Sequence, residues 1–560
     1  MITAAAPTKL SHNEVLKENS PTLSGTLAST LANAEVDRFS EDDGQFLKFH
    51  GIYQQDDRDK RKVAKYYMFM IRTRFPGGVI PPAQYLVLDR LADTYGNQTL
   101  RATTRQTIQF HGVVKTGLGK LMKTLNENLM TTIAACGDVS RNVMAPPTPA
   151  TSPFVEEVLE DARHISTTLL PKTPAYHQIW VEGTQLDLGN EAKDFVDPLY
   201  GKTYLPRKFK AVMGIPPLND VDLFTNCLGY IAIIESGKLV GYNLTVGGGM
   251  GVSHGNAQTF PRLADVIGFV TREQLETVSK GVLTIHRDFG DRTNRKHARL
   301  KYVLEDKGAE WFKAELENRI GFKLPPARDY KFTKQGDLFG WHSQVDGKEF
   351  LGLYVEAGRI KDTATVKFKA AVREIVEKYQ IEVRLTPSQN ILLANVAVEL
   401  KQPITEILAR HGIDVGNQGT IVRRAMMACP AMPTCGLALA ESERYLPDLV
   451  GRIEQLMEEV GLGGEEIIIR MTGCPNGCAR PFMAELGFVG KAPNKYQIYF
   501  GGNESSTRLN KMYKDSVPAA TIIDELRPVF TRFVAERTQG ERFGDFCARV
   551  IWNDPVPAKN

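Results

Sequence analysis

The chain has 560 residues, 42% of them hydrophobic and 24% charged, which excludes a mainly disordered protein and a small disulfide-stapled fold. Because 69 Lys and Arg face 65 Asp and Glu, the net charge is only +4, so bulk charge does not indicate a nucleic-acid partner. The first residues lack an apolar signal segment, and no apolar run approaches the ~18 residues of a membrane span. We therefore expect a cytoplasmic protein without a membrane partner.

An α+β fold is predicted from the order of the elements. Residues 1–45 are polar and are expected to form a mobile arm with at most a short helix, and the mixed charges of residues 54–62 favour a solvated loop. Strands are predicted over residues 66–74, 99–114, 208–215, 230–235, 350–356, 391–396, 466–470 and 497–500. Helices are predicted over residues 83–95, 118–135, 154–169, 272–285, 364–379, 446–460 and 522–536.

One stretch of sequence occurs twice. Residues 100–110, Leu-Arg-Ala-Thr-Thr-Arg-Gln-Thr-Ile-Gln-Phe, resemble residues 383–393, Val-Arg-Leu-Thr-Pro-Ser-Gln-Asn-Ile-Leu-Leu. Each copy follows a predicted helix, and the spacing, 283 residues from Arg101 to Arg384, is about half the chain. Chance similarity is the alternative. We infer a duplicated half with pseudo-twofold symmetry.

Four of the seven cysteines form two close pairs in loops rich in Pro and Gly. The first pair is Cys429 and Cys435, with five residues between them, and the second is Cys474 and Cys478, with three. These gaps favour a [4Fe–4S] cluster over a zinc knuckle, and unligated buried thiols remain a third possibility. The other three, predicted to be buried as small hydrophobic residues, are Cys136, Cys227 and Cys547.

Basic residues gather in a few segments of an otherwise neutral chain. If residues 99–114 formed one strand, alternate side chains would share a face. That face would carry Arg101, Thr103, Arg105, Thr107, Gln109 and His111. Repeated Arg and Thr suit a ligand with several carboxylates better than they suit a solvated strand face, which is the alternative. Further basic residues are Arg72, Arg141, Arg207, Lys208 and Lys210, and the last two would point the same way from a strand.

These motifs resemble those of the sirohaem-dependent sulfite and nitrite reductases. The resemblance rests mainly on the segment Thr-Gly-Cys-Pro-Asn-Gly-Cys-Ala-Arg at residues 472–480, together with the Cys-x5-Cys pair. The resemblance runs through nearly the whole chain, with matching segments at residues 50–58, 105–112, 204–210, 241–244, 254–256 and 541–546.

The resemblance implies roles for the residues already named. A [4Fe–4S] cluster would be held by Cys429, Cys435, Cys474 and Cys478, the last of which would also ligate the sirohaem iron. A small anion would bind at Arg72, Arg141, Lys208 and Lys210. The sirohaem carboxylates would meet Arg101, Arg105, Gln109, His111 and Arg207, together with Arg299 or Lys301. Thr104 departs from some relatives, which carry Asn there, and this puts one peripheral contact in doubt.

The resemblance also implies a domain plan. It comprises an N-terminal partner-docking arm (1–70), two halves of a ferredoxin-like "parachute" domain (71–135 and 346–424), a sirohaem and substrate domain (136–345) and a cluster domain (425–560).

The implied activity is the six-electron reduction of sulfite to sulfide. Neither residues 247–251 nor residues 117–120 complete a nucleotide-binding motif, so a flavoprotein reductase subunit using NADPH is the expected electron donor. The alternatives are a nitrite reductase of the same fold and, outside enzymes, an iron–sulfur protein that binds nucleic acid.

Overall fold

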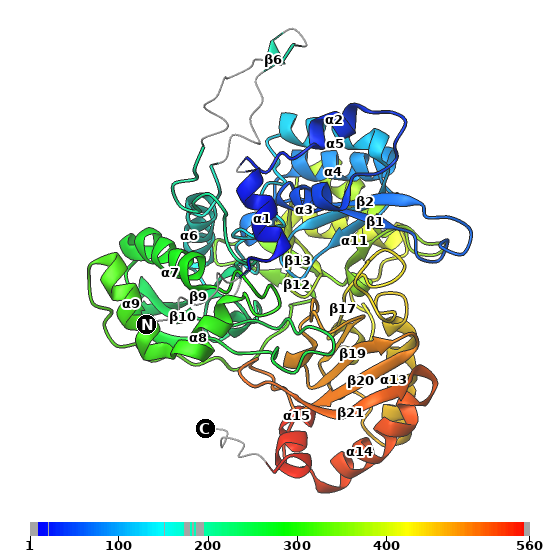
Figure 1. The fold of residues 1–560 in the computed structure, drawn as a ribbon. Helices are drawn as coiled ribbons and strands as arrows, with labels where there is room; N and C mark the ends of the chain where they lie inside the picture. Colours follow the sequence, from blue (N-terminus) through cyan, green and yellow to red (C-terminus); the bar gives the residue numbers. More distant parts are fainter. Residues whose placement is uncertain are drawn as a thin grey trace.

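The computed structural model describes residues 9–20, 22–149, 152–172, 180–181, 184–185 and 195–553. Two five-stranded sheets, which we call the central sheets, each take their last strand from the other half of the chain. Their strands β1 and β2, and β12 and β13, are labelled in the upper and middle parts of Figure 1. The first sheet has the order β1 (Ile52–Asp56), β2 (Tyr67–Arg72), β5 (Ile108–Val113), β4 (Leu100–Ala102) and β14 (Arg359–Ile360). The second has the order β12 (Gly340–Ser343), β13 (Glu349–Leu353), β16 (Ile391–Val396), β15 (Glu382–Leu385) and β3 (Val79–Ile80).

The exchange of β3 and β14 confirms the duplication seen in the sequence. The two sheets and their helices share one hydrophobic core; the helices are α4 (Pro82–Tyr95), α5 (Lys115–Glu127), α10 (Phe368–Tyr379) and α11 (Lys401–Arg410). Gln106 and Gln389, 283 residues apart, both have positive φ. Their side-chain oxygens accept hydrogen bonds from the N–H groups of Ala145 (3.0 Å) and Ala428 (3.2 Å), which are also 283 residues apart. The two copies of the repeat therefore share the same backbone conformation and the same hydrogen bond at equivalent positions.

Two outer sheets repeat a second pattern. One has the order β8 (Ala211–Gly214), β9 (Leu228–Glu235), β10 (Lys238–Val246) and β11 (Asp265–Val270). The other has the order β17 (Met426–Ala428), β18 (Ile469–Thr472), β19 (Leu486–Ala492), β20 (Lys495–Phe500) and β21 (Lys511–Pro518). The β8–β9 and β18–β19 pairs are parallel, and two antiparallel strands follow each pair. The duplication thus extends beyond the central sheets.

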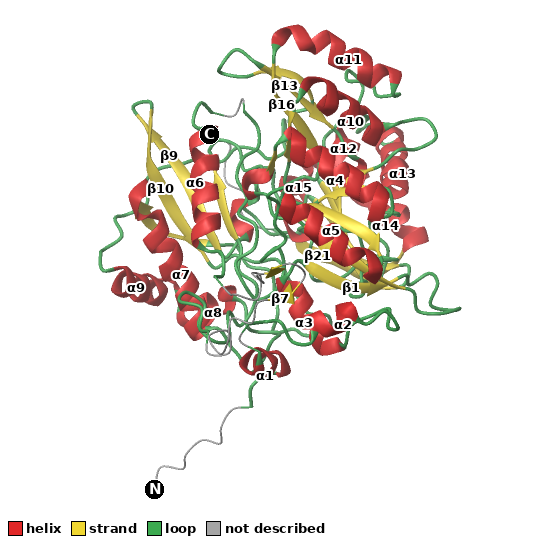
Figure 2. Ribbon diagram, turned by 90° about the horizontal axis from the view of Figure 1, so that it is seen from above, coloured by secondary structure: helices red, strands yellow, loops and turns green. Residues whose placement is uncertain are grey.

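Helices cover these outer sheets. The β8–β11 sheet packs with α6 (Val155–Thr168), α7 (Leu275–Phe289), α8 (Leu300–Lys307) and α9 (Ala309–Ile320), on one side of Figure 2. The other outer sheet carries α12 (Ile421–Arg424), α13 (Leu446–Glu459), α14 (Ile522–Glu536) and α15 (Phe543–Phe546). A short hairpin pairs β6 (Trp180–Val181) with β7 (Thr184–Gln185). Among the described residues, every helix is too short or too polar to cross a bilayer.

The expected mobile arm is wrong for the part of it that the structure describes; residues 1–8 lie outside that part. This segment forms α1 (His12–Asn19), α2 (Leu27–Ala32) and α3 (Glu41–Phe49). Glu14 and Lys17 are buried against the body: Lys17 donates to Glu14 (2.6 Å) and to the Leu205 carbonyl (2.8 Å). The polar composition predicted a mobile arm, but a Lys and a Glu that are paired with each other can be buried. In addition, β2 crosses the proposed domain boundary at residue 70.

The strand predicted over residues 99–114 is also wrong, because it is a hairpin. The chain turns at residues 103–107, where Thr103 donates its N–H to the Thr107 carbonyl (3.0 Å), and Arg101 pairs with Gln109 in the register of β4 and β5. The six polar residues therefore do not share one strand face. Two further boundaries moved: α5 ends at Glu127, and Lys208 and Lys210 precede β8 instead of lying in it.

Candidate functional site

Both cysteine loops leave the same edge of a sheet. The neighbouring strands β17 and β18 are parallel, with Ala428 opposite Met471, so their carboxyl ends lie side by side. Cys429 follows β17 directly, and Cys474 comes two residues after β18. Two pairs far apart in sequence are brought together in this way, which agrees with the predicted common site.

The four thiols, which we call the thiol cluster, act on one another electrostatically. Burial and then Cys478 raise the pKa of Cys474 to about 12, and burial with the charges of Cys478, Cys474 and Cys435 raises the pKa of Cys429 still further. Four thiolates around one zinc would lie within about 4 Å of one another, because each Zn–S bond is about 2.3 Å. No set of three or more His, Cys, Asp or Glu residues in the described part of the chain is spaced for a single ion. A set of four cysteines with these sequence gaps suits an iron–sulfur cluster.

Backbone N–H and amide groups already point at the sulfurs. The Gly473 N–H donates to Cys429 Sγ (3.3 Å), and Asn476 Nδ2 donates to Cys474 Sγ (3.5 Å). Gly473 has no room for a side chain, since an added Cβ would lie 2.5 Å from the Ala440 carbonyl oxygen and 2.6 Å from Ala431 Cβ. The loops therefore approach one another more closely than any residue but glycine allows.

The predicted anion-binding residues, Arg72, Arg141, Lys208 and Lys210, lie together; we call them the cationic site. Burial and then the charges of Arg207 and Arg299 lower the pKa of Lys208 to about 7, and Cys478 and Arg141 act on it as well. Burial and then Arg105 and Lys208 lower the pKa of Lys210 well below its usual range. Cys478 also acts on the pKa values of Arg72 and Lys210, after burial and nearer charges. The thiol cluster and the cationic site therefore meet at Cys478.

Arg72 is fixed by three side chains. Its Nη1 donates to Cys136 Sγ (3.0 Å), and its guanidinium lies 6.0 Å from the centre of the Tyr53 ring. With the Gln109 amide oriented to satisfy its neighbours, Arg72 Nε donates to Gln109 Oε1 (3.0 Å), and Gln109 Nε2 donates to His111 Nε2 (3.2 Å). Gln109 and His111 therefore support Arg72 on the side away from Cys136.

The site has more buried positive charge than protein anions. The Arg105 guanidinium finds only neutral oxygens, on Asn226 (2.8 Å), Asn142 (2.6 Å) and Ala211 (3.0 Å), and its Nε has no partner. Burial and then the balance of nearby charges lower the pKa of Arg105 to about 9. The buried Nε of Arg299 and Nδ1 of His111 also lack partners. Buried charges without partners are costly, so this set fits a ligand with several carboxylates, as sirohaem has.

Four of the predicted sirohaem-binding residues are engaged by protein atoms. Arg101 Nε donates to Glu443 (2.8 Å), and its Nη2 donates to the carbonyls of Ala357 and Ala428. Lys301 Nζ donates to the carbonyls of Gly249, Gly251 and Phe260. The hydroxyls of Thr103 and Thr107 bond each other (2.7 Å). The proposed contacts of these residues with sirohaem stay predictions. Thr104, by contrast, donates to the Cys478 carbonyl (2.9 Å) and so belongs to the site.

The sequence analysis missed several contacts. Cys136 was expected to be a partnerless buried thiol, but it accepts a hydrogen bond from Arg72; Cys227 Sγ likewise lies 3.8 Å from Arg299 Nη2. Cys547 is packed in an apolar core, as expected. The loop after β1 is not simply solvated, because Arg58 donates to the Cys435 carbonyl (3.3 Å). No sequence spacing signals these contacts, which join residues far apart in the chain.

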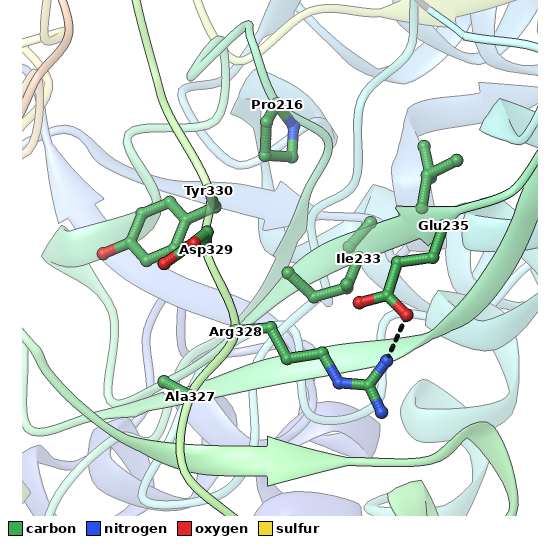
Figure 3. Close-up of a pocket in the computed structure, with 9 residues that line it drawn as sticks. Pro216, Ile233, Glu235, Ala327, Arg328, Asp329 and Tyr330 are labelled. Atoms are coloured by element: carbon green, nitrogen blue, oxygen red, sulfur yellow. Dashed lines mark hydrogen bonds and ion pairs between the residues drawn. The ribbon is translucent and has the colours of Figure 1, made fainter.

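A large surface hollow lies elsewhere. Its volume is about 650 Å³, and it is lined by Pro216, by residues 232–235 of β9 and by residues 327–330 (Figure 3). Arg328 and Glu235 form an ion pair across it (2.6 Å). None of the residues of the thiol cluster or the cationic site lines this hollow, so size alone does not identify the site.

Comparison with known proteins agrees with this site. Residues 160–324 match the family described as "Nitrite and sulphite reductase 4Fe-4S domain", and residues 61–128 and 342–411 match "Nitrite/Sulfite reductase ferredoxin-like half domain". A protein of Myxococcus xanthus named "Sulfite reductase [NADPH] hemoprotein beta-component" is 49% identical over 99% of this chain and 98% of its own. The chain belongs to the nitrite and sulfite reductase family. It is therefore an oxidoreductase of that family, with a sirohaem and a [4Fe–4S] cluster as its cofactors.

Other members of the nitrite and sulfite reductase family give the same result. A protein of Oceanobacillus iheyensis with the same name is 47% identical over 97% of this chain and 95% of its own. The solved structure of the Mycobacterium tuberculosis NirA protein shares the fold, with a TM-score of 0.79 at 23% identity, covering 97% of this chain and 96% of that one. The matched 4Fe-4S domain region contains Cys227 but none of the thiol cluster, which lies in the second copy of the outer sheet.

Proposed function

We propose that the chain is the haemoprotein component of an NADPH-dependent sulfite reductase and reduces sulfite to sulfide. One observation carries the proposal: Cys478 acts electrostatically both on the other thiols of the thiol cluster and on the cationic site. An electron-transfer centre and an anion-binding site thus share one residue. The near-full-length similarity to proteins named as sulfite reductase haemoprotein components supports the choice of substrate.

The residues that would hold the cofactors are those described above. The thiol cluster would bind the [4Fe–4S] cluster, Cys478 would also reach the sirohaem iron, and Arg105, Arg207 and Arg299 would meet sirohaem carboxylates. When bound, this pair of cofactors would relay electrons from the donor to the substrate one at a time, six in all.

The chain's own residues bind, orient and protonate the anion. Arg72, held by Cys136 and Gln109, and Arg141, held by the carbonyls of Gly137 (3.0 Å) and Ala135 (3.1 Å), present fixed positive charge. Lys208, with a pKa of about 7, can give up a proton near neutral pH. Each oxygen that leaves sulfite needs two protons to depart as water, and the two lysines of the cationic site, Lys208 and Lys210, are the side chains proposed to supply them. Both lysines would then be reloaded from solvent.

The electron donor in this proposal is a separate flavoprotein subunit that oxidises NADPH. The name "beta-component" borne by the relatives supports a partner of this kind. All seven cysteines are free, which suits a reducing compartment, and we propose a cytoplasmic location on that ground.

The test uses purified holoenzyme with reduced viologen as donor, so that no partner is needed. We expect a chlorin-type absorption band, iron and acid-labile sulfide, and a larger kcat/KM for sulfite than for nitrite. Cys478→Ser should lose the sirohaem band and the activity. A larger kcat/KM for nitrite would instead favour the second candidate, a nitrite reductase of the same fold, and a Cys478→Ser protein with full activity would refute the cofactor assignment.

A further inference from the structure

A second cavity opens beside the cationic site. Its volume is about 230 Å³, and its walls come from α1, α3, the loop before Arg141 and the cysteine loop at Leu437. At about 30 Å³ per water molecule, it holds roughly seven waters. A small oxyanion with part of its hydration shell fits this space, whereas a nucleotide does not. Arg141 belongs to both the cavity wall and the cationic site, so the two are contiguous.

The wall of this cavity is strongly positive. Five of its side chains are cationic and one is acidic; they are Lys17, Lys48, Arg141, Arg207, Arg295 and Asp138. Glu14, behind the wall, is paired with Lys17 (2.6 Å), so five positive charges and two negative charges leave +3. A hollow with low-dielectric walls focuses such a field and raises the local concentration of anions.

The one acid of the wall is already shared. Asp138 accepts from both terminal nitrogens of Arg295 (2.7 and 3.0 Å), and Lys17 and Arg207 each lie 3.7 Å from it. Burial alone would raise the pKa of Asp138, but the charges of Arg295 and then Lys17 hold this pKa well below its usual range. Asp138 therefore stays ionised and offsets one charge of several.

Lys48 is the clearest cation without a counter-charge. Its Nζ donates to Gln45 (2.7 Å) and lies 5.7 Å from the centre of the Tyr53 ring. No carboxylate among the described residues lies within ion-pair distance of it. Burial and then Arg295 lower the pKa of Lys48 to about 8. An anion beside Lys48 would relieve this repulsion.

We infer that this cavity is a second anion-binding site, an outer vestibule that holds a small oxyanion before it passes Arg141 to the cationic site. The inference rests on the proposed function, because it names sulfite as the anion that passes through. Lys48 is its recruiting charge, and α1 and α3 are its outer wall.

The test replaces Lys48 in the holoenzyme, with reduced viologen as donor. We expect Lys48→Gln to lower kcat/KM for sulfite about three- to tenfold at low ionic strength, with kcat unchanged, because the reacting site is intact. The difference should shrink as salt screens the field. Lys48→Arg should restore the wild-type value. Lys123→Gln, which removes an exposed charge from α5, should match the wild type.

Two further measurements separate the possible outcomes. In the oxidised holoenzyme, the rate at which sulfite perturbs the haem absorbance should fall in Lys48→Gln, and this readout needs no turnover. The sirohaem content should equal that of the wild type. A lowered content with an unchanged kcat/KM per haem would assign Lys48 to a sirohaem carboxylate and overturn the vestibule. A wild-type holoenzyme that binds sulfite through Lys48 but does not reduce it would overturn the proposed function alone.

Discussion

At the scale of single residues, the chemistry depends on positive charges that lack protein counter-charges. Lys208 and Lys210 are the clearest pair, because arginines crowd both side chains and Lys208 also acts on Lys210. An anion is the natural partner for such a group, and the same crowding lowers the lysine pKa values until a proton can leave. Binding and proton donation thus arise from one arrangement.

Replacing both lysines with alanine should remove sulfite turnover while leaving the cofactors in place. We expect kcat to fall about 100-fold or more, since preorganised charges at the reacting anion are lost. The haem absorbance and the iron content should remain near wild type. Unchanged turnover in this variant would place the anion site elsewhere.

The pH dependence of the reaction should report Lys208. Its pKa is lowered to about 7, so its charged form prevails below that pH and is lost above it. We expect kcat/KM for sulfite, measured with reduced viologen, to fall as the pH rises through about 7. Sulfite itself titrates in this range, so Lys208→Arg, which stays charged, is the control. Identical profiles for the two proteins would contradict the assignment.

At the scale of elements, the site is built at the ends of strands. The parallel pair β17 and β18 delivers Cys429 and Cys474 to one edge, and the two loops then run so close that only glycine fits at position 473. The cluster site therefore depends as much on the missing side chain as on the thiols.

Gly473→Ala should disrupt the cluster without touching a ligand. The added Cβ would press on Ala440 and Ala431, so the loop carrying Cys474 must shift. We expect acid-labile sulfide to fall to a small fraction of the wild-type amount. Gly436→Ala is the matched control in the other cysteine loop, because an added Cβ there meets no atom within 4 Å. Equal loss in both variants would show a general sensitivity of these loops.

Sequence patterns anticipated most elements but not their ends. The helix predicted at residues 522–536 and the strand predicted at residues 391–396 match α14 and β16, because their periodic apolar residues face a core. The hairpin at residues 99–114 was missed, since its turn contains neither Gly nor Pro and takes its positive φ at Gln106. In the site, the cysteine spacing was informative, whereas the contact of Cys136 with Arg72 joins distant segments and left no local signal.

At the scale of the whole molecule, buried ion pairs join the domains. Asp222, from the loop after β8, accepts hydrogen bonds from Arg470 of β18 (2.7 Å) and from Arg480. Burial alone would raise the pKa of Asp222, but these two arginines lower it to about 2. Arg480 also donates to the carbonyl of Thr104 (2.8 Å), in the turn between β4 and β5, so both outer sheets and one central sheet are linked through this carboxylate.

Asp222→Asn should loosen this junction. Removing one partner of a buried pair leaves the arginines uncompensated and costs about 3 to 5 kcal/mol of unfolding free energy. Thermal or urea unfolding of the holoenzyme measures the loss. Asp265→Asn removes a partly exposed partner of Arg262 and should cost less than about 1 kcal/mol. Similar losses in the two variants would show that Asp222 is not a special junction.

The exchanged strands β3 and β14 have a consequence for synthesis on the ribosome. Residues 79–80 must wait for residues 382–385, made about 300 residues later, before their sheet is complete. At roughly 5 to 20 residues per second, that wait lasts about 15 to 60 s. During it, the first half of the chain presents an unpaired sheet edge, the kind of surface that recruits foreign strands. A chaperone would therefore matter most while the ribosome makes the residues between β3 and β15. In the same interval, two ribosome-bound copies could exchange strands.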